Sequence, residues 1–175
     1  MPATASPCAP FIAEMEQEAM ATRRLLERLP SDRLTWRPHA KSQTLGQLAL
    51  HVATTPAIVT GMMAVDTLDA ATVDFASAQP ASVAEVRTKF EESLSGAKAA
   101  LGRWGERELS TVWRLQKDGK DVMAMPKAAM LRAIVLNHHV HHRGQLTVYL
   151  RMLDVPLPSV YGPSADENPF APPTR

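Results

Sequence analysis

Residues 82–104 carry an apolar stripe that recurs every three or four positions, and this period restricts the segment to an amphipathic helix. Ser82 comes directly before the stripe and Glu85 follows three residues later, a pairing that forms a capping box at a helix N-terminus. Gly102 and Gly105 predict its end. The apolar positions are Val83, Val86, Phe90, Leu94, Ala97, Leu101 and Trp104. A helix with one apolar face must bury it, so we expect further helices along the chain.

Two further helices are predicted upstream of this stripe. The first spans about Phe11–Leu29, where apolar residues again recur at helical spacing, and Pro30 stops it. The following segment, Ser31–Ala40, is expected to be a loop. The second helix begins at Thr44, which forms a capping box with Gln47.

The second helix contains Pro56, which removes one helical hydrogen bond and is expected to kink it. A fourth helix opens at Pro126 and runs to about Leu153. Before it, Asp118-Gly119 is a hairpin turn signal, and both a small hairpin and a plain loop fit the flanking residues. Four amphipathic runs with little strand signal predict an all-α four-helix bundle, with a possible small hairpin before the last helix.

Prolines gather at both ends of the chain. Three of the 14 prolines fall in residues 1–10 and six in residues 154–175, so we expect an extended N-terminal arm and an extended C-terminal tail on a single domain, 1–175. Cys8, the only cysteine, is expected to be an incidental exposed thiol in that arm, and no internal disulfide can form. The tail has four apolar residues that could pack on the bundle or on a second subunit: Leu157, Val160, Tyr161 and Phe170.

The charge balance argues against polyanionic partners. Lys plus Arg number 19 and Asp plus Glu 18, a net charge of +1, which gives no reason to expect nucleic acid or an anionic membrane. No stretch approaches the roughly 20 apolar residues of a membrane span, and the first residues lack the pattern of a secretory signal. We therefore expect a cytoplasmic protein.

Four of the six histidines fall in residues 138–142 of the last predicted helix. His138 and His142 are four positions apart and lie on one face, on a stripe that we expect to point inward. That stripe is traced as Leu131, Val135, His138, His142, Gln145, Tyr149 and Met152. This spacing lets two imidazoles hold one ion from a rigid backbone. His139 and His141 lie off the stripe and are expected to support the ligands or to face solvent.

A third ligand is expected from a facing helix, because helical bundles build metal sites from neighbouring helices. His51 is the candidate, since it lies on the inward stripe of the second helix. His39 is the rival, but it stands beside Pro38 in a loop and is expected to be exposed. A pH-responsive histidine cluster and ordinary packing remain open as alternatives.

Three neutral imidazoles would leave a divalent ion with an open coordination position, as in catalytic rather than structural zinc sites. Such an ion could ionise water for hydrolysis, or a small thiol for attack on an electrophile. Hydrolysis would need a proton shuttle, for which Glu14 and Glu18 are candidates unless they form a solvated charged face. Gln145 could hydrogen-bond a ligand imidazole, and Arg143 is expected in a surface or interface ion pair.

The segment Asn137–Leu146, NHHVHHRGQL, resembles the NHxxHHRGQ motif of the DinB family of damage-inducible proteins, which includes the YfiT-like metal-dependent hydrolases. Three shorter segments are also similar: TWRP at 35–38, TLGQLALHV at 44–52 and VYGPSADE at 160–167. The resemblance implies a four-helix bundle, often a homodimer, with one zinc, nickel, iron or manganese ion. Carried over by motif, its ligands are His51, His138 and His142.

Some members of this family are S-transferases that use bacillithiol or mycothiol, and the resemblance therefore implies a low-molecular-weight thiol as cosubstrate. Together these features predict a metal-dependent enzyme that activates a thiol or water toward a small-molecule substrate. The alternatives are a metal-binding, stress-related helical dimer without turnover, and a helical scaffold whose histidines only pack.

Overall fold

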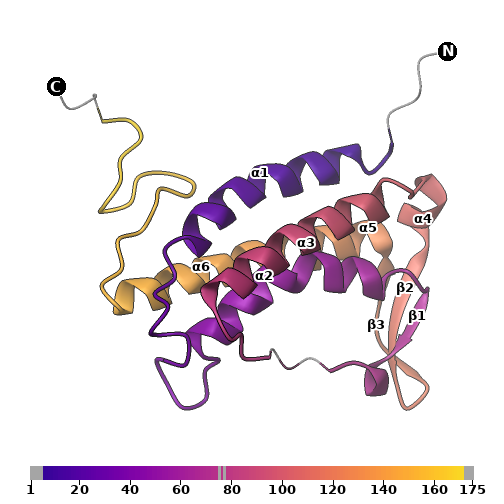
Figure 1. Cartoon of the computed structure of the whole chain (residues 1–175). Helices are drawn as coiled ribbons and strands as arrows, with labels where there is room; N and C mark the ends of the chain where they lie inside the picture. The colour runs from indigo at the N-terminus through magenta and orange to yellow at the C-terminus, as the bar shows by residue number, and fades with distance from the viewer. Residues whose placement is uncertain (1–5, 75, 77, 172–175) are drawn as a thin grey trace.

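The computed structural model describes residues 6–74, 76 and 78–171, and its architecture is mostly helical, as predicted (Figure 1). Long helices run alongside one another, with a small sheet at one end and the C-terminal segment at the other (Figure 1). The long helices are α1 (Ala9–Leu26), α2 (Leu45–Met62), α3 (Val83–Leu101) and α6 (His138–Met152). In the described part of the chain, no helix is both long and apolar enough to cross a membrane.

Helix α1 begins two residues before the predicted start and ends at Leu26, three residues before the predicted end. Pro10 lies in the first helical turn, where its missing N–H costs nothing, so this proline starts the helix rather than extending an arm. The prediction for Cys8 was wrong, because its side chain is fully buried in the core. Residues 1–5 of the predicted arm and residues 172–175 of the predicted tail lie outside the described residues.

The N-termini of α2 and α3 follow the predicted capping chemistry. Thr44 accepts a hydrogen bond from the Gln47 amide at 3.1 Å, and the Gln47 side chain accepts one from the Thr44 amide at 3.0 Å. Ser82 accepts from the Glu85 amide at 3.1 Å, whereas the Glu85 carboxylate accepts from the Ala81 amide rather than from Ser82. Both caps satisfy amides that the first helical turn leaves without partners.

Helix α2 continues through Pro56 because α3 repairs the broken hydrogen-bond pattern. The hydroxyl of buried Ser93 on α3 accepts a hydrogen bond from the Ala57 amide at 3.0 Å and donates one to the Thr54 carbonyl at 3.2 Å. The hydrogen bonds of Ser93 therefore fix the position of α2 along α3 at the proline, about one turn beyond His51.

The hairpin left open by the sequence is present and carries a third strand that the sequence did not reveal. Strands β2 (Val112–Lys117) and β3 (Lys120–Pro126) pair antiparallel, and β1 (Thr67–Asp69) adds in parallel to β2. Asp118 and Gly119 both have positive φ, as the tight turn requires. Two short helical segments adjoin the strands, the 3-10 turn Ala70–Thr72 and α4 (Glu106–Ser110).

The last predicted helix is continuous but not uniform. It consists of α5 (Lys127–Met130), a π-helical segment (Leu131–Asn137) and α6. A π turn takes up more residues than an α turn, so the positions after it are rotated relative to the regular helical period. The inward stripe predicted from that period holds only in part of α6. Tyr149 is buried as predicted, but Met152 is 55% exposed, while Leu146 and Leu150, which lie off the stripe, are fully buried.

Arg143 lies on the buried face of α6, which corrects the expectation of a surface ion pair. Its side chain is 1% exposed and pairs with the Glu18 carboxylate of α1 at 2.6 Å. It also donates to the Glu18 carbonyl at 3.0 Å. The tail covers this pair, since Tyr161 donates its hydroxyl proton to Glu18 at 2.7 Å and the Arg143 guanidinium lies 5.0 Å from the Tyr161 ring centre.

The described part of the tail contains no helix or strand beyond α6 and packs on the bundle through polar contacts. Arg24 of α1 forms an ion pair with Glu167, and Arg151 of α6 forms one with Asp166. Leu157 packs against the core as predicted, whereas Phe170 is 78% exposed and does not anchor the tail to this chain.

We predict that Arg143→Ala lowers the free energy of unfolding by about 3–5 kcal/mol, because it leaves the Glu18 carboxylate without its buried partner. Arg132→Ala is the matched control. It removes an ion pair to Glu14 of the same helix α1, but both side chains there are more than one third exposed, so the loss should be at most about 1 kcal/mol. Urea unfolding measures both, and equal losses would contradict the structural role of Arg143.

Candidate metal centre

His51 of α2 and the pair His138 and His142 of α6 converge on one point. One ring nitrogen from each of the three residues lies within 4.8 Å of the others. The Nε2 atoms of His51 and His138 are 3.1 Å apart, and the ring centres of His138 and His142 are 4.3 Å apart. All three side chains are half-buried. The structure therefore brings together the three residues that the sequence selected as metal ligands.

The elements that carry these rings explain the convergence. Helix α6 starts at His138, directly after the π-helical segment, and the regular α turn that follows places His142 next to it. The ring of His51 on α2 lies next to both, with its centre 5.3 Å from that of His138 and 4.6 Å from that of His142. π-helical turns occur frequently at functional sites.

The geometry fits a divalent ion. Two imidazole nitrogens on one tetrahedral zinc ion, each about 2.0–2.1 Å from it, are about 3.3 Å apart. The 3.1 Å between His51 and His138 needs only a small adjustment to match that value. The cluster that the described residues form here contains only histidines, a donor set that suits zinc, nickel and iron.

Burial favours the neutral imidazoles of His51 and His138. It lowers the pKa of His51 to about 4, with smaller contributions from the neighbouring His142 and His138. It also lowers the pKa of His138, again with contributions from His142 and His141. A neutral imidazole has the free lone pair that a metal ion requires, so the cluster is ready to bind at neutral pH.

Gln145 makes the contact with a ligand imidazole that the sequence suggested. Its Oε1 lies 2.9 Å from Nδ1 of His142 and can accept the Nδ1–H of that ring. This bond leaves the Nε2 lone pair of His142 free to face the ion.

The other three histidines lie outside the cluster. His139 is buried, its Nε2 lies 3.0 Å from the Thr22 hydroxyl of α1, and burial with the nearby Arg143 charge lowers its pKa to about 4. His141 is exposed, with its ring centre 4.8 Å from that of His142. His39 is exposed in a loop, as predicted.

The two suggested proton shuttles are held in ion pairs elsewhere. Glu14 pairs with Arg132, and Glu18 pairs with Arg143 and accepts from Tyr161. Neither carboxylate lines the cavity next to the cluster. These contacts give the two residues structural roles on α1.

A cavity of about 450 Å³ opens beside the histidine cluster, with His51 and His138 in its wall. The rest of the wall is mostly apolar and comes from α2, the sheet and the helical segment before α6. The sequence did not reveal it, because its residues lie up to 88 positions apart (Leu50 to His138) and carry no shared motif.

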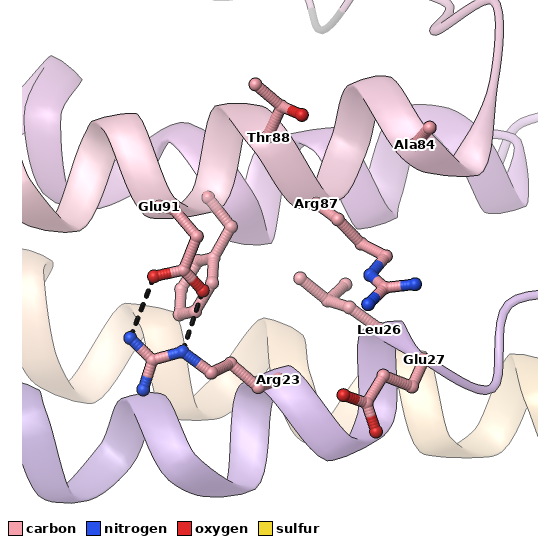
Figure 2. Close-up of a pocket in the computed structure, with 8 residues that line it drawn as sticks. Arg23, Leu26, Glu27, Ala84, Arg87, Thr88 and Glu91 are labelled. Carbon is pink, nitrogen blue, oxygen red and sulfur yellow. Dashed lines mark hydrogen bonds and ion pairs between the residues drawn. The ribbon is translucent and has the colours of Figure 1, made fainter.

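A second cavity, of about 360 Å³, lies between α1 and α3, and none of the three clustered histidines lines it (Figure 2). Figure 2 shows Arg23 and Glu91 directed toward each other across this groove. They form two hydrogen bonds of 2.7 and 2.8 Å, and the Arg23 guanidinium lies 5.8 Å from the Phe90 ring centre. The paired charges join α1 to α3, which is a structural role.

Comparisons with known proteins agree with the motif and the fold. The model of the DinB family matches residues 1–171. The uncharacterized protein YrdA of Bacillus subtilis is 28% identical over 158 residues, which cover 90% of this chain and 89% of YrdA. The crystal structure of a DinB-like protein from Bacillus cereus has a TM-score of 0.69 at 23% identity and covers 90% of this chain and 100% of its own. That of the DinB-like protein YjoA from B. subtilis has a TM-score of 0.64 at 18% identity, with 86% and 96% covered. At these identities the two structures show the fold.

We predict that the metal-free protein loses stability as the pH falls from about 6.5 toward 4. An unfolded histidine has a pKa near 6.5, whereas folded His51 has a pKa of about 4. Over this interval the unfolded state binds the extra proton and is favoured. Urea unfolding at several pH values should show a smaller loss for His51→Gln than for wild type, and an unchanged loss for His39→Gln. An equal pH dependence in all three proteins would contradict the low pKa of His51.

Proposed function

The chain belongs to the DinB family, and on that premise we propose that it is a metal-dependent enzyme acting on a small molecule. The single observation that carries the proposal is the meeting of His51, His138 and His142 beside a cavity of small-molecule size. The ion is zinc, nickel, iron or manganese. A homodimer and a cytoplasmic location, both expected from the sequence, belong to the same proposal.

The protein's own residues would supply ligands, orientation and an apolar surrounding. His51 and His138 offer neutral nitrogens because burial lowers their pKa values, and Gln145 fixes the ring of His142. A divalent ion held there would lower the pKa of a thiol or water that binds it. The apolar cavity wall would limit access of bulk water to the reacting groups.

Thiol transfer is favoured over hydrolysis because neither of the proton shuttles suggested by the sequence, Glu14 and Glu18, lines the cavity beside the cluster. The ligand cluster found among the described residues contains no carboxylate, and both Glu14 and Glu18 are engaged in ion pairs. Hydrolysis usually needs a proton donor at the leaving group. Attack by a small thiol needs no protein base to remove the thiol proton, because a bound ion would itself favour the thiolate. The proposed reaction is therefore transfer of a low-molecular-weight thiol to an electrophile.

We predict that the purified protein binds about one divalent ion per chain and that His51→Ala, His138→Ala and His142→Ala each weaken binding by tenfold or more. Loss of one of three ligands leaves two, which hold an ion poorly. His39→Ala is the matched control and should bind like wild type, since His39 lies in an exposed loop. Elemental analysis after dialysis against zinc, nickel, iron and manganese measures the stoichiometry. Equal metal contents in all five proteins would contradict the site.

We predict that the metal-loaded protein conjugates a small thiol to monochlorobimane, and that chelation or His142→Ala abolishes the conjugation above the uncatalysed rate. The thiols to compare are bacillithiol, mycothiol, glutathione and cysteine. Fluorescence of the conjugate reports the rate. Stoichiometric metal without turnover with any of the thiols would favour the alternative of a non-catalytic, stress-related metal-binding protein.

A further inference from the structure

We infer that the cavity beside the histidine cluster takes an uncharged, largely apolar small molecule, which is the electrophilic substrate of the proposed enzyme. That this molecule is a substrate rests on the proposed function, whereas its chemical class follows from the residues that line the cavity. Its volume of about 450 Å³ lies at the lower end of the range of about 300–1,000 Å³ found for small-molecule sites. Such a space excludes a folded partner or a polymer.

The wall of the cavity is apolar on three sides. Ile58 and Met62 contribute from α2, Trp113 and Met123 from the sheet, and Ile134 from the π-helical segment. Trp113 is buried and fixed, because its indole N–H donates to the Met62 carbonyl at 3.1 Å. Apolar ligand groups would be stabilised in proportion to the surface they remove from water against this wall.

The charges of the wall argue against an anionic ligand. Among the described residues that line the cavity there is no Lys or Arg, and the only acidic residue is Asp74. The Asp74 carboxylate already accepts the Ala76 amide at 2.8 Å. Away from the ion proposed at His51 and His138, a carboxylate or phosphate in this cavity would lose its hydration without gaining a cationic side chain in the wall, which is costly. The remaining polar residues among those described in the wall are Thr54, Thr55 and the two imidazoles of His51 and His138, and the imidazoles are the groups placed to meet a reacting group.

The methionines in the wall predict that the cavity accepts apolar molecules of different shapes. Met62, Met123 and Met130 all line the cavity, and unbranched thioether chains adapt their shape to different apolar groups at little cost. We therefore expect several hydrophobic skeletons to bind with similar affinity.

The arrangement also separates two approaches to the cluster. His51 and His138 line the cavity, whereas His142 does not and lies next to the exposed His141. A polar, charged thiol can reach the cluster from the solvent side at His142, while the apolar reactant occupies the cavity. Both reactants would then meet at the three rings without displacing each other.

The test uses two fluorescent compounds that share one skeleton, the neutral N-phenyl-1-naphthylamine and the anionic 1-anilinonaphthalene-8-sulfonate. We expect the metal-free protein to bind the neutral compound saturably, about one per chain, and at least tenfold more tightly than the sulfonate, because no Lys or Arg among the described residues lines the wall. Ile58→Lys should weaken binding of the neutral compound by tenfold or more. Ile58 is 49% exposed, so the variant should fold. Val148→Lys is the matched control, since Val148 is 57% exposed on α6 and does not line the cavity.

Binding of the neutral compound should persist in His142→Ala, which lacks a ligand of the ion but retains the cavity. Non-saturable binding, equal affinity for the sulfonate, or an Ile58→Lys variant that binds like wild type would overturn the inference. Selective binding of the neutral compound by a wild-type protein that takes up no metal would contradict the proposed function alone. The two failures are therefore distinguishable in one set of titrations.

Discussion

The packing of α2 against the last helix is the constraint on which the candidate site depends, because it sets the separation of His51 from the pair His138 and His142. Both helices contribute fully buried leucines to the core beneath the rings, Leu48 from α2 and Leu146 from α6. Two polar contacts then fix the position of each helix along its neighbour. Ser93 docks α2 at the proline turn, and the buried Arg143 ties α6 to α1. Close-packed cores resist sliding, so nitrogens on different helices can be held at ligand distance.

The same burial that stabilises the helices prepares the cluster chemically. Imidazoles at the edge of a core lose their protonated forms, and a low pKa means that no proton competes with a metal ion at neutral pH. The mostly apolar cavity adjoins the rings, since His51 and His138 are part of its wall together with residues of α2, the sheet and the π-helical segment. One side of the cluster is thus apolar and enclosed, while His142 and Gln145 face outward. This asymmetry favours the proposed site for two reactants over a closed structural metal site.

The sequence predicted the helical architecture and the three converging histidines, because helical period and a four-residue histidine spacing are local signals. It misjudged features that depend on distant partners. The π-helical segment rotated α6, so Arg143 faces the core and Met152 faces solvent, against a prediction that assumed 3.6 residues per turn throughout. Strand β1 has three residues and pairs with β2 more than 40 positions away, which no local pattern encodes. Cys8 seemed part of an arm because Pro10 was interpreted as a break instead of a helix start. The cavity has no sequence signal at all, since its wall is assembled from α2, residues before α3, two strands and the segments of the last helix.

X-ray absorption at the metal edge of the loaded protein tests most directly whether three imidazoles share one ion. We expect three nitrogen ligands at about 2.0–2.1 Å for zinc, with the outer-shell scattering typical of imidazole rings, and with one imidazole fewer in His51→Ala. A first shell containing sulfur, or one made of oxygen with at most one imidazole, would contradict the convergence of His51, His138 and His142 on a common ion.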